Sequence, residues 1–450
     1  MLLRFRCKNF RSIREEQELS LIAAKTRTDE RSESLIATPF EDLKLLRCAA
    51  IYGANASGKS NVLAALSAFS DIVSESQRLW RPSGPIPRYD PFVLDDTSSN
   101  DASEFEIVFL LDSSIFRYGF RFNRTTFLRE WLVDATSRDK VLFHRESEGE
   151  DTQVSFPNKN LIKSAEDARH LEGIRKDVRP NSLFYSASAQ RNHLLLTRIC
   201  SFLTDGFDSL GNYRIRERAV ASCREEDRRK QVLEMLRFAD VGIRDLSVSS
   251  MNFPEPDPQS EAGLRQAFPG LFPNSEKLEP LPPLNFLWLS HAGAKDRSYL
   301  LKEVDESGGT LAYLSILGPL LDRLRDGGLL LIDELESSLH PALARELVRI
   351  FNSPKLNPKG AQVIFTTHNT NLLDMGLLRR DQVWFTEKNR EGATRLFPLT
   401  DYQPRTNQNI EAGYLGGRFG AIPFLDEQLL RESLIPSEPA QTSLEFSSEG

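Results

Sequence analysis

The stretch CAAIYGANASGKS, residues 48–60, decides the fold. Its first five residues are an apolar run that predicts a buried strand, and NVLAAL, residues 61–66, predicts a helix directly after the loop. The loop itself has the pattern GxxxxGK followed by Ser, and strand, glycine-rich loop and helix follow one another as in a P-loop. The sequence therefore predicts an α/β fold with a phosphate-binding loop. The alternative, a glycine-rich turn with an ordinary lysine, leaves this order unexplained.

The residue types of the loop suit a nucleoside triphosphate with magnesium. Glycines let backbone N–H groups approach phosphates, and the N-terminus of a helix adds a favourable dipole. We expect Lys59 to contact the β- and γ-phosphates and Ser60 to offer its hydroxyl to Mg²⁺. The expected cofactors are therefore ATP and Mg²⁺. The residues predicted to bind them in this loop are Gly53, Asn55, Ala56, Ser57, Gly58, Lys59, Ser60 and Asn61.

A second motif, LLLIDE at residues 329–334, is a short apolar run that ends in two acids. Runs of this kind are typical of buried parallel strands, and ligands bind at the carboxyl ends of such strands. Asp333 would then orient Mg²⁺ or its water, and Glu334 would polarise the attacking water. An acidic pair that caps the next helix is the alternative, which the presence of a P-loop in the same chain disfavours.

Two weaker signals flank the second motif. ESGGT, residues 306–310, places small residues at the start of a helix predicted over 310–324, so it forms either a second phosphate cradle or a simple helix cap. VIFTTH, residues 363–368, is a predicted strand that ends in His368, where a γ-phosphate contact is expected. A purely structural histidine is the alternative. A further helix is predicted over 341–351.

The order of these motifs resembles the ABC-type ATPase heads of the SMC, Rad50 and RecF group. The matching segments are Walker A at 53–60, the signature at Ser307, Gly308 and Gly309, Walker B at 329–334, the D-loop at 337–340 and the switch histidine at His368. KNFRSI, residues 8–13, resembles the turn by which such heads place an arginine, here Arg11, near the nucleotide. The resemblance implies that Lys59, Glu334 and His368 are the catalytic residues and that Ser60 and Asp333 hold the metal.

The chain is more similar still to compact bacterial ATPases labelled AAA15. This group includes the ATPase subunits of anti-phage systems of the PARIS and Septu types and is akin to the overcoming-lysogenization-defect proteins. The resemblance lies in DELESSLHP, residues 333–341, and EAGYLGGRFG, residues 411–420.

Three positions depart from the wider ABC pattern. His340 stands where many heads have a D-loop aspartate, and Thr310 stands where the signature has a glutamine. The Q-loop has two weak candidates, the region around Phe92 and Gln190.

In heads of this kind two copies meet face to face. ATP on Lys59 of one copy is completed by Ser307 and Gly308 of the other, and hydrolysis opens the pair. The resemblance therefore implies a dimer of the chain with itself, or a higher oligomer. It also implies a separate nuclease or toxin effector, because the residues after His368 contain no Asp-x-Asp pair of the kind that a Toprim nuclease uses to hold metal.

Three functions stay open at this point. The first is the sensor or regulatory ATPase of an anti-phage system, the second a RecF-like repair ATPase that binds duplex DNA, and the third an ATP-binding scaffold with little turnover. The basic residues Arg4, Arg6, Lys8 and Arg11 could contact DNA, although a solvated strand face is the favoured interpretation. Residues 411–420 are interpreted as a docking loop or tight turn rather than a second phosphate site.

Composition limits the class of protein. The chain has 450 residues, 40% hydrophobic and 27% charged, and its net charge of -7 excludes a wholly basic nucleic-acid binder. No apolar run approaches the roughly 20 residues of a membrane span. The four cysteines lack the CxxC spacing of a zinc site. We expect a cytoplasmic protein with reduced thiols and no membrane segment.

The pattern along the chain predicts two α/β pieces around an insertion of different composition. Residues 3–8 alternate like a half-exposed strand, and 105–109 and 116–122 alternate like paired antiparallel strands. The predicted domains are the N-terminal half of an ABC-type head with a β subdomain at 1–156, a helical insertion at 157–250, a proline-rich linker at 251–284, the C-terminal half of the head at 285–435 and a disordered tail at 436–450. One nucleotide-binding head is thus expected to form from both ends of the chain.

Overall fold

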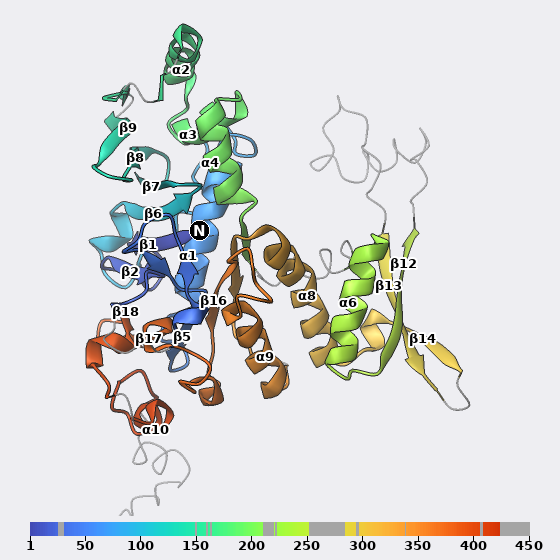
Figure 1. Ribbon diagram of the computed structural model, residues 1–450. Coiled ribbons are helices and arrows are strands. Elements are labelled where there is room, and N and C mark those ends of the chain that lie inside the picture. Colours follow the sequence, from blue (N-terminus) through green and yellow to red (C-terminus); the bar gives the residue numbers. More distant parts are fainter. Residues whose placement is uncertain are drawn as a thin grey trace, which may run out of the picture.

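The computed structural model describes residues 1–25, 31–148, 151–158, 161–162, 164–209, 220, 223–251, 284–293, 297–337, 339–405 and 408–423. Two large sheets and a three-stranded sheet dominate this part of the chain, with helices between and beside them (Figure 1). Residues 252–283 of the expected linker and the whole expected tail lie outside the described residues.

A seven-stranded antiparallel sheet forms one layer, in the order β10-β9-β8-β7-β6-β1-β2. Its strands are β1 (Leu2–Lys8), β2 (Gln17–Ser20), β6 (Ser103–Leu111), β7 (Ser114–Phe122), β8 (Phe127–Asp134), β9 (Lys140–Glu148) and β10 (Asp151–Ser155). Buried and less buried side chains alternate along β1 and β6, as in a sheet with one face in the core. The predicted antiparallel strands and the half-exposed first strand are confirmed.

A six-stranded sheet forms the other large layer, in the order β11-β15-β16-β5-β17-β18. Its strands are β5 (Cys48–Gly53), β11 (Phe207–Ser209), β15 (Leu329–Ile332), β16 (Gln362–Thr366), β17 (Val383–Lys388) and β18 (Thr394–Pro398). β18 pairs antiparallel with β17, and the other pairs are parallel. The predicted strands at 48–52, 363–365 and 329–332 are therefore neighbours, and both ends of the chain build one sheet.

Helices cover both faces of the six-stranded sheet. They include α1 (Lys59–Glu75), α8 (Gly308–Asp326) and α9 (Pro341–Asn352), which confirm the predicted helices. Ala49 and Ile51 of β5 pack in one core with α1 and the seven-stranded sheet, so α1 lies between the two layers (Figure 1). Ala50 and Tyr52 point the other way, into a second core with α8 and α9. This two-sided burial explains why the strands are continuous apolar runs.

The expected helical insertion at 157–250 contains strands as well as helices. Among its described residues, the helices are α2 (Ala165–Asp177), α3 (Phe184–Gln190), α4 (Leu194–Thr204) and α6 (Glu226–Phe238). β11 extends the six-stranded sheet, and β12 (Ile243–Met251) pairs with β13 (Leu284–Ala292), which pairs with β14 (Ser298–Lys302). The insertion therefore contains both helices and strands. A strand as short as β11 shows no periodicity, so the sequence pattern could not reveal it. The domain limits stay a prediction.

Shorter elements complete the described part of the chain. They are β3 (Ile36–Ala37), β4 (Lys44–Leu45), α10 (Ile410–Leu415) and the 3₁₀ helices at 32–34, 98–100, 303–305, 370–372, 380–382 and 399–402. No helix among the described residues is both long and apolar enough to cross a membrane. The four cysteines are free thiols, and burial raises the pKa of Cys223 to about 11.

Candidate nucleotide-binding site

The P-loop joins β5 to α1 through a backbone that few residue types tolerate. Ala56 has a φ of 62° and Gly58 a φ of 104°, both in the left-handed region. A Cβ atom on Gly53 would lie 2.5 Å from both the Ser57 and the Thr386 hydroxyl oxygens. The two glycines of the motif are thus required by backbone conformation and by space.

Hydroxyl groups from three distant segments clamp the loop. Ser57 Oγ and Thr386 Oγ1 share a hydrogen bond of 2.6 Å, and Thr394 Oγ1 donates to the Ser57 carbonyl at 2.9 Å. Ser12 Oγ lies 2.8 Å from Thr394 Oγ1 and accepts from Asn61 Nδ2 at 2.6 Å. β17, β18 and the turn after β1 therefore fix the loop, and sequence reasoning missed these hydroxyl residues.

The side chain of Lys59 folds back against the P-loop. Its side chain is 5% exposed, and its Nζ donates to the carbonyl oxygens of Gly53 and Ala54, each at 3.0 Å. Burial lowers the pKa of Lys59, while the nearby carboxylates, Glu334 first and Asp333 second, oppose that shift. A buried ammonium beside acids is suited to bind the negative charge of a triphosphate.

The predicted metal ligands meet although they are far apart in the chain. Ser60 Oγ donates to Asp333 Oδ1 at 3.0 Å, and Thr366 Oγ1 donates to the same oxygen at 2.6 Å. One hydroxyl and one carboxylate are hard oxygen donors of the kind that Mg²⁺ takes, together with water and phosphate oxygens. The donor set therefore fits Mg²⁺, and Ser60 and Asp333 are the residues that would hold it.

Glu334 follows Asp333 in a strained conformation. Its φ of 51° is left-handed, which is uncommon for a residue with a side chain. Its backbone N–H donates to Thr366 Oγ1 at 2.7 Å, and its side chain is exposed beyond the end of β15. Strain of this kind persists where the surrounding structure imposes it, and it is concentrated at functional sites.

His368 follows β16 at the same edge of the sheet. Its side chain is exposed, and its backbone N–H donates to Glu336 Oε1. The next residue accepts a 3.3 Å hydrogen bond at its carbonyl from Tyr52 Oη, whose strand leads into the P-loop. The structure thus brings the P-loop, the two acids and the histidine together at the carboxyl ends of β5, β15 and β16.

A comparison with protein-family models agrees with this geometry. The family described as "AAA domain, putative AbiEii toxin, Type IV TA system" matches residues 48–374, more than half of the chain. The chain belongs to this AAA-domain family. It is an α/β P-loop ATPase, as the motif order predicts.

Solved structures resemble this AAA domain at low similarity. The SMC head bound to the C-winged helix domain of ScpA is 12% identical at a TM-score of 0.43, covering 89% of this chain and 99% of that one. The SMC head domain from Thermotoga maritima is 13% identical at 0.36, covering 88% and 98%. The Smc head with an extended coiled coil, bound to the C-terminal domain of ScpA derived from Pyrococcus furiosus, is 12% identical at 0.37, covering 89% and 97%. No curated protein matches. Similarity this low transfers no function.

The turn that contains Arg11 adjoins the P-loop of the AAA domain through Ser12. Arg11 itself has a φ of 51°, and its Nε donates to Asp90 Oδ2 at 2.9 Å. The Arg11 backbone N–H also donates to the Asp90 carbonyl at 2.7 Å. Its guanidinium is therefore held by an exposed acid, and its role toward nucleotide stays a prediction.

The signature residues lie at the N-terminus of α8. Ser307 caps this helix, because its Oγ accepts from the Thr310 N–H at 3.1 Å, and both Ser307 and Gly308 are exposed. Within the described residues no hydrogen bond or ion pair joins Ser307, Gly308 or Gly309 to the P-loop of the same chain. The residues expected to form the signature are thus not joined to the P-loop of their own chain, and Ser307 and Gly308 are exposed.

The D-loop and Q-loop candidates have local roles. His340 caps α9, its Nδ1 accepting from the Ala342 N–H at 3.2 Å, while residue 338 lies outside the described residues. Gln190 is exposed at the end of α3. Phe92 is 1% exposed, so its side chain belongs to the core rather than to a ligand contact.

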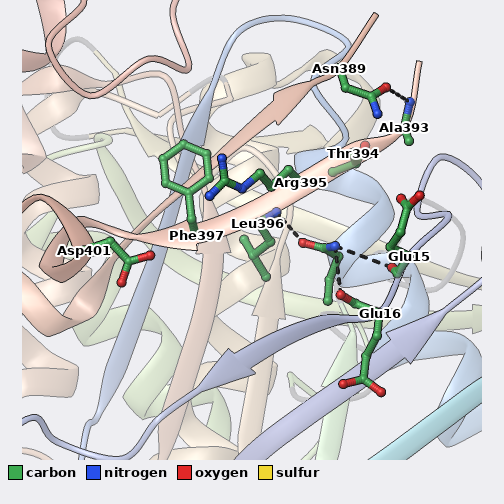
Figure 2. A pocket seen from close by; sticks show the side chains of 10 residues that line it. Glu15, Glu16, Asn389, Ala393, Thr394, Arg395, Leu396, Phe397 and Asp401 are labelled. Atoms are coloured by element: carbon green, nitrogen blue, oxygen red, sulfur yellow. Dashed lines mark hydrogen bonds between the residues drawn. The ribbon is translucent and has the colours of Figure 1, made fainter. Parts of the chain in front are cut away.

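A pocket of about 430 Å³ lies along β18 and the segment that precedes β2, and Thr394 of the clamp is one of its lining residues (Figure 2). It is lined by Glu15, Glu16, Gln17, Asn389, Ala393, Thr394, Arg395, Leu396, Phe397 and Asp401. Gln17 crosses it, with Oε1 accepting from the Leu396 N–H at 2.7 Å and Nε2 donating to the Glu16 carbonyl at 2.9 Å. Its three carboxylates face a single guanidinium, which disfavours a phosphate ligand.

Residues 411–420 form α10 and the turn that follows it. The Tyr414 ring lies 5.8 Å from that of Tyr52 and 5.5 Å from that of Phe385, on the face of the sheet opposite α1. The segment is therefore a packed helix and turn against the strand that leads into the P-loop. Residues 411–415 are thus helical, which the interpretation as a docking loop or tight turn did not include, and only the residues after α10 form a turn.

Proposed function

We propose that the chain binds MgATP at residues 53–60 and hydrolyses it slowly. Lys59 and the loop N–H groups bind the phosphates, while Ser60 and Asp333 would hold Mg²⁺, which would supply charge neutralisation at the phosphates. Glu334 polarises the attacking water, and His368 contacts the γ-phosphate. The observation that supports this proposal most is the 3.0 Å contact between Ser60 and Asp333, because no local sequence feature requires it.

The test of the site uses two variants with matched controls. Lys59→Ala should lose ATP binding, because the loop then lacks its ammonium. Glu334→Gln should bind ATP but lose turnover by roughly 10²-fold or more, as expected for loss of a general base. Lys355→Ala and Glu41→Gln, at exposed positions away from the site, should behave as the unaltered protein does. Unchanged hydrolysis in Glu334→Gln would contradict the role of that carboxylate.

The complete site, in this proposal, needs a second copy of the chain. Ser307 and Gly308 are exposed and not bonded to their own P-loop, so they are free to complete the ATP site of a partner. Helix N-termini with small residues bind phosphate well. ATP then works as a clamp that closes two heads, and hydrolysis opens them.

A mixing experiment tests this shared site. Lys59→Ala and Ser307→Arg should each be inactive alone. In a mixed dimer one site combines the intact P-loop of Ser307→Arg with the intact signature of Lys59→Ala, so turnover should return. Absence of any recovery, with mixed dimers shown by differential tagging, would refute a site shared between copies.

The biological role that we propose is the sensor or regulatory ATPase of a bacterial anti-phage system, acting in the cytoplasm on a separate nuclease or toxin. Residues 333–341 and 411–420 support it through their resemblance to such ATPases, and the family name refers to a toxin of a toxin–antitoxin system. Co-purification of the tagged chain from its native host should recover a nuclease-like or toxin-like protein. Recovery of replication or repair proteins instead would favour the alternative below.

The alternative, a RecF-like ATPase that binds duplex DNA, finds less support on the surface. Arg6 Nε lies 2.5 Å from Glu18 Oε2, and Arg4 lies 4.0 Å from the same carboxylate. Arg11 pairs with Asp90 at 2.9 Å. Acids thus neutralise most of the basic face of β1, which weakens attraction to phosphates. Stimulation of turnover by DNA with steep salt dependence would reverse this preference, and intact binding without turnover would indicate a scaffold.

A further inference from the structure

The turn that contains His368 is held from both sides by carboxylates. On one side, Glu336 accepts the His368 backbone N–H at Oε1. On the other, Glu411 of the C-terminal segment accepts from Thr370 Oγ1 at 2.7 Å. Hydrogen bonds to an ionised carboxylate are roughly twice as strong as those between neutral groups. Two charged acceptors at one exposed turn therefore fix it more firmly than its own short contacts would.

The other hydrogen bonds of this turn are long or internal to it, so they do not fix its position as the two carboxylates do. Tyr52 Oη donates to the Asn369 carbonyl at 3.3 Å, a long hydrogen bond for a phenol. Asn369 N–H donates to Thr367 Oγ1 at 3.0 Å, which is internal to the turn. Among the described residues the His368 ring makes no hydrogen bond, so the backbone of the turn decides where the imidazole points.

Only one of the two carboxylate oxygens of Glu336 is hydrogen-bonded among the described residues. Its Oε2 is buried and has no hydrogen-bond partner among the described residues. A buried carboxylate oxygen without a partner lowers stability, and only favourable contacts elsewhere offset that cost. Glu336 lies between the turn after β15 and the histidine turn, and its one side-chain hydrogen bond among the described residues goes to the His368 N–H.

We propose that Glu336 and Glu411 are positioning residues that set the turn 368–370, and with it the imidazole of His368, for ATP hydrolysis. This inference rests on the proposed function, since it concerns the same site. It also gives residues 411–420 a role in that site. Helix α10 connects the histidine turn, through Glu411, with the P-loop strand, through the packing of Tyr414 on Tyr52.

The first experiment separates position from charge. Glu336→Ala should lower kcat by about 10- to 100-fold with little change in KM for ATP, because a displaced catalytic group costs rate rather than ground-state binding. Glu336→Gln should have a kcat between those of Glu336→Ala and the unaltered protein, because its amide oxygen accepts the same N–H through a weaker, neutral hydrogen bond. Glu166→Ala, an exposed acid on α2, is the control. Equal loss in the Gln and Ala variants would overturn a positional role, since the charge itself would then be required.

The second experiment tests the contact with α10. Glu411→Ala and Thr370→Val each remove one partner of the 2.7 Å hydrogen bond, so each should lower kcat. The double variant should be no worse than either single variant, because both remove the same interaction. Full additivity of the two losses would overturn the assignment of Glu411.

A readout independent of turnover keeps the inference distinct from the proposed function. Hydrogen exchange at the His368 amide, followed by mass spectrometry of a peptide over residues 366–371, should be up to about tenfold faster in Glu336→Ala and less accelerated in Glu336→Gln. Unchanged exchange in Glu336→Ala would overturn the inference. Absence of turnover in the unaltered protein would instead refute the proposed function.

Discussion

Gly58 stands where the P-loop joins α1, and two separate constraints fix its identity. Its φ of 104° is rare for any residue with a Cβ atom. A Cβ built on it would lie 2.1 Å from Thr394 Oγ1, the hydroxyl that holds the Ser57 carbonyl. A side chain at this position would therefore strain the loop and displace its clamp at the same time.

Gly58→Ala should lower both the thermal midpoint and the affinity for ATP. Strain in the left-handed region costs about 1–3 kcal/mol, before any displacement of Thr394. Differential scanning fluorimetry and titration with a fluorescent ATP analogue measure the two effects. Gly173→Ala on α2 is the control, because a Cβ there meets only Arg191 Nη1, at 4.0 Å, and alanine favours a helix. A Gly173→Ala protein less stable than Gly58→Ala would contradict this reasoning.

The sequence predicts site residues where the motif is contiguous and fails where the site depends on tertiary contacts. Lys59 and Ser60 are adjacent in one motif, and Asp333 follows an apolar run, so a short stretch of sequence is enough to predict their roles. Thr386 and Thr394 bind Ser57 from strands more than 300 residues later in the chain. Threonine is common in strands, so nothing in their local pattern distinguishes a clamp from a surface residue.

At the scale of elements, a buried ion pair attaches α3 to the seven-stranded sheet. Glu130 of β8 accepts the backbone N–H groups of Phe184 at 2.8 Å and Tyr185 at 2.9 Å, at the start of α3. Arg145 of β9 lies 3.7 Å from the same carboxylate and donates to the Ser182 carbonyl at 2.6 Å. Both charged side chains are fully buried, so each depends on the other.

Arg145→Met should destabilise the protein by about 3–5 kcal/mol, because it leaves the Glu130 carboxylate buried without its cation. Urea denaturation at neutral pH measures the loss. Arg129→Met is the matched control, since its pair with Glu146 is more than half exposed and should be worth about 0–1 kcal/mol. Similar losses in the two variants would mean that burial does not decide the value of these pairs.

The pH dependence of this pair has a definite sign. Burial raises the pKa of Glu130, and Arg145 partly offsets that shift. An acid whose pKa is raised on folding contributes stability that is fully present below its unfolded pKa and lost as pH rises through its folded pKa. Compared with Glu130→Gln, the unaltered protein should therefore lose unfolding free energy as pH rises from about 4.5. Parallel urea curves from pH 4.5 to 8 check this, and a difference that is constant with pH would refute it.

Some element boundaries can be predicted from the local sequence, whereas others depend on tertiary pairing. Helix α9 begins at Pro341 after a His340 cap, and β5 is an apolar run that ends in glycine, so their limits agree with the sequence prediction. β11 is a strand because it pairs with β15, not because its three residues prefer that conformation. Sequence periodicity therefore located the long elements but not the edge of the sheet.

At the scale of the whole molecule, one buried amide joins the two large sheets. Gln362 of β16 accepts the Leu2 N–H at 2.6 Å and donates to the Leu2 carbonyl at 3.0 Å. Its Nε2 also donates to the Leu46 carbonyl at 3.0 Å, and its side chain is fully buried. The seven-stranded sheet is thus bonded to the nucleotide-binding sheet at the start of β1.

Gln362→Leu should lower the unfolding free energy by about 1–3 kcal/mol, because the Leu2 N–H stays buried without a partner. The exchange of the Leu2 amide should rise more than that of amides within β5, since β1 loses its attachment first. Gln153→Leu, at an exposed position of β10, is the control. Equal acceleration of exchange in β1 and β5 would indicate global rather than local loosening.

The position of β5 between β16 and β17 has a consequence for synthesis on the ribosome. At about 5–20 residues per second, tens of seconds separate translation of residues 48–53 from that of residues 383–388. Until residues 362–366 are made the nascent strand has neither of its hydrogen-bonding neighbours, and until residue 386 is made its glycine-rich loop lacks the hydroxyl of Thr386. Competence to capture a nucleotide thus arises late in translation. A product truncated by a stalled ribosome before β17 should be inert and in need of a chaperone.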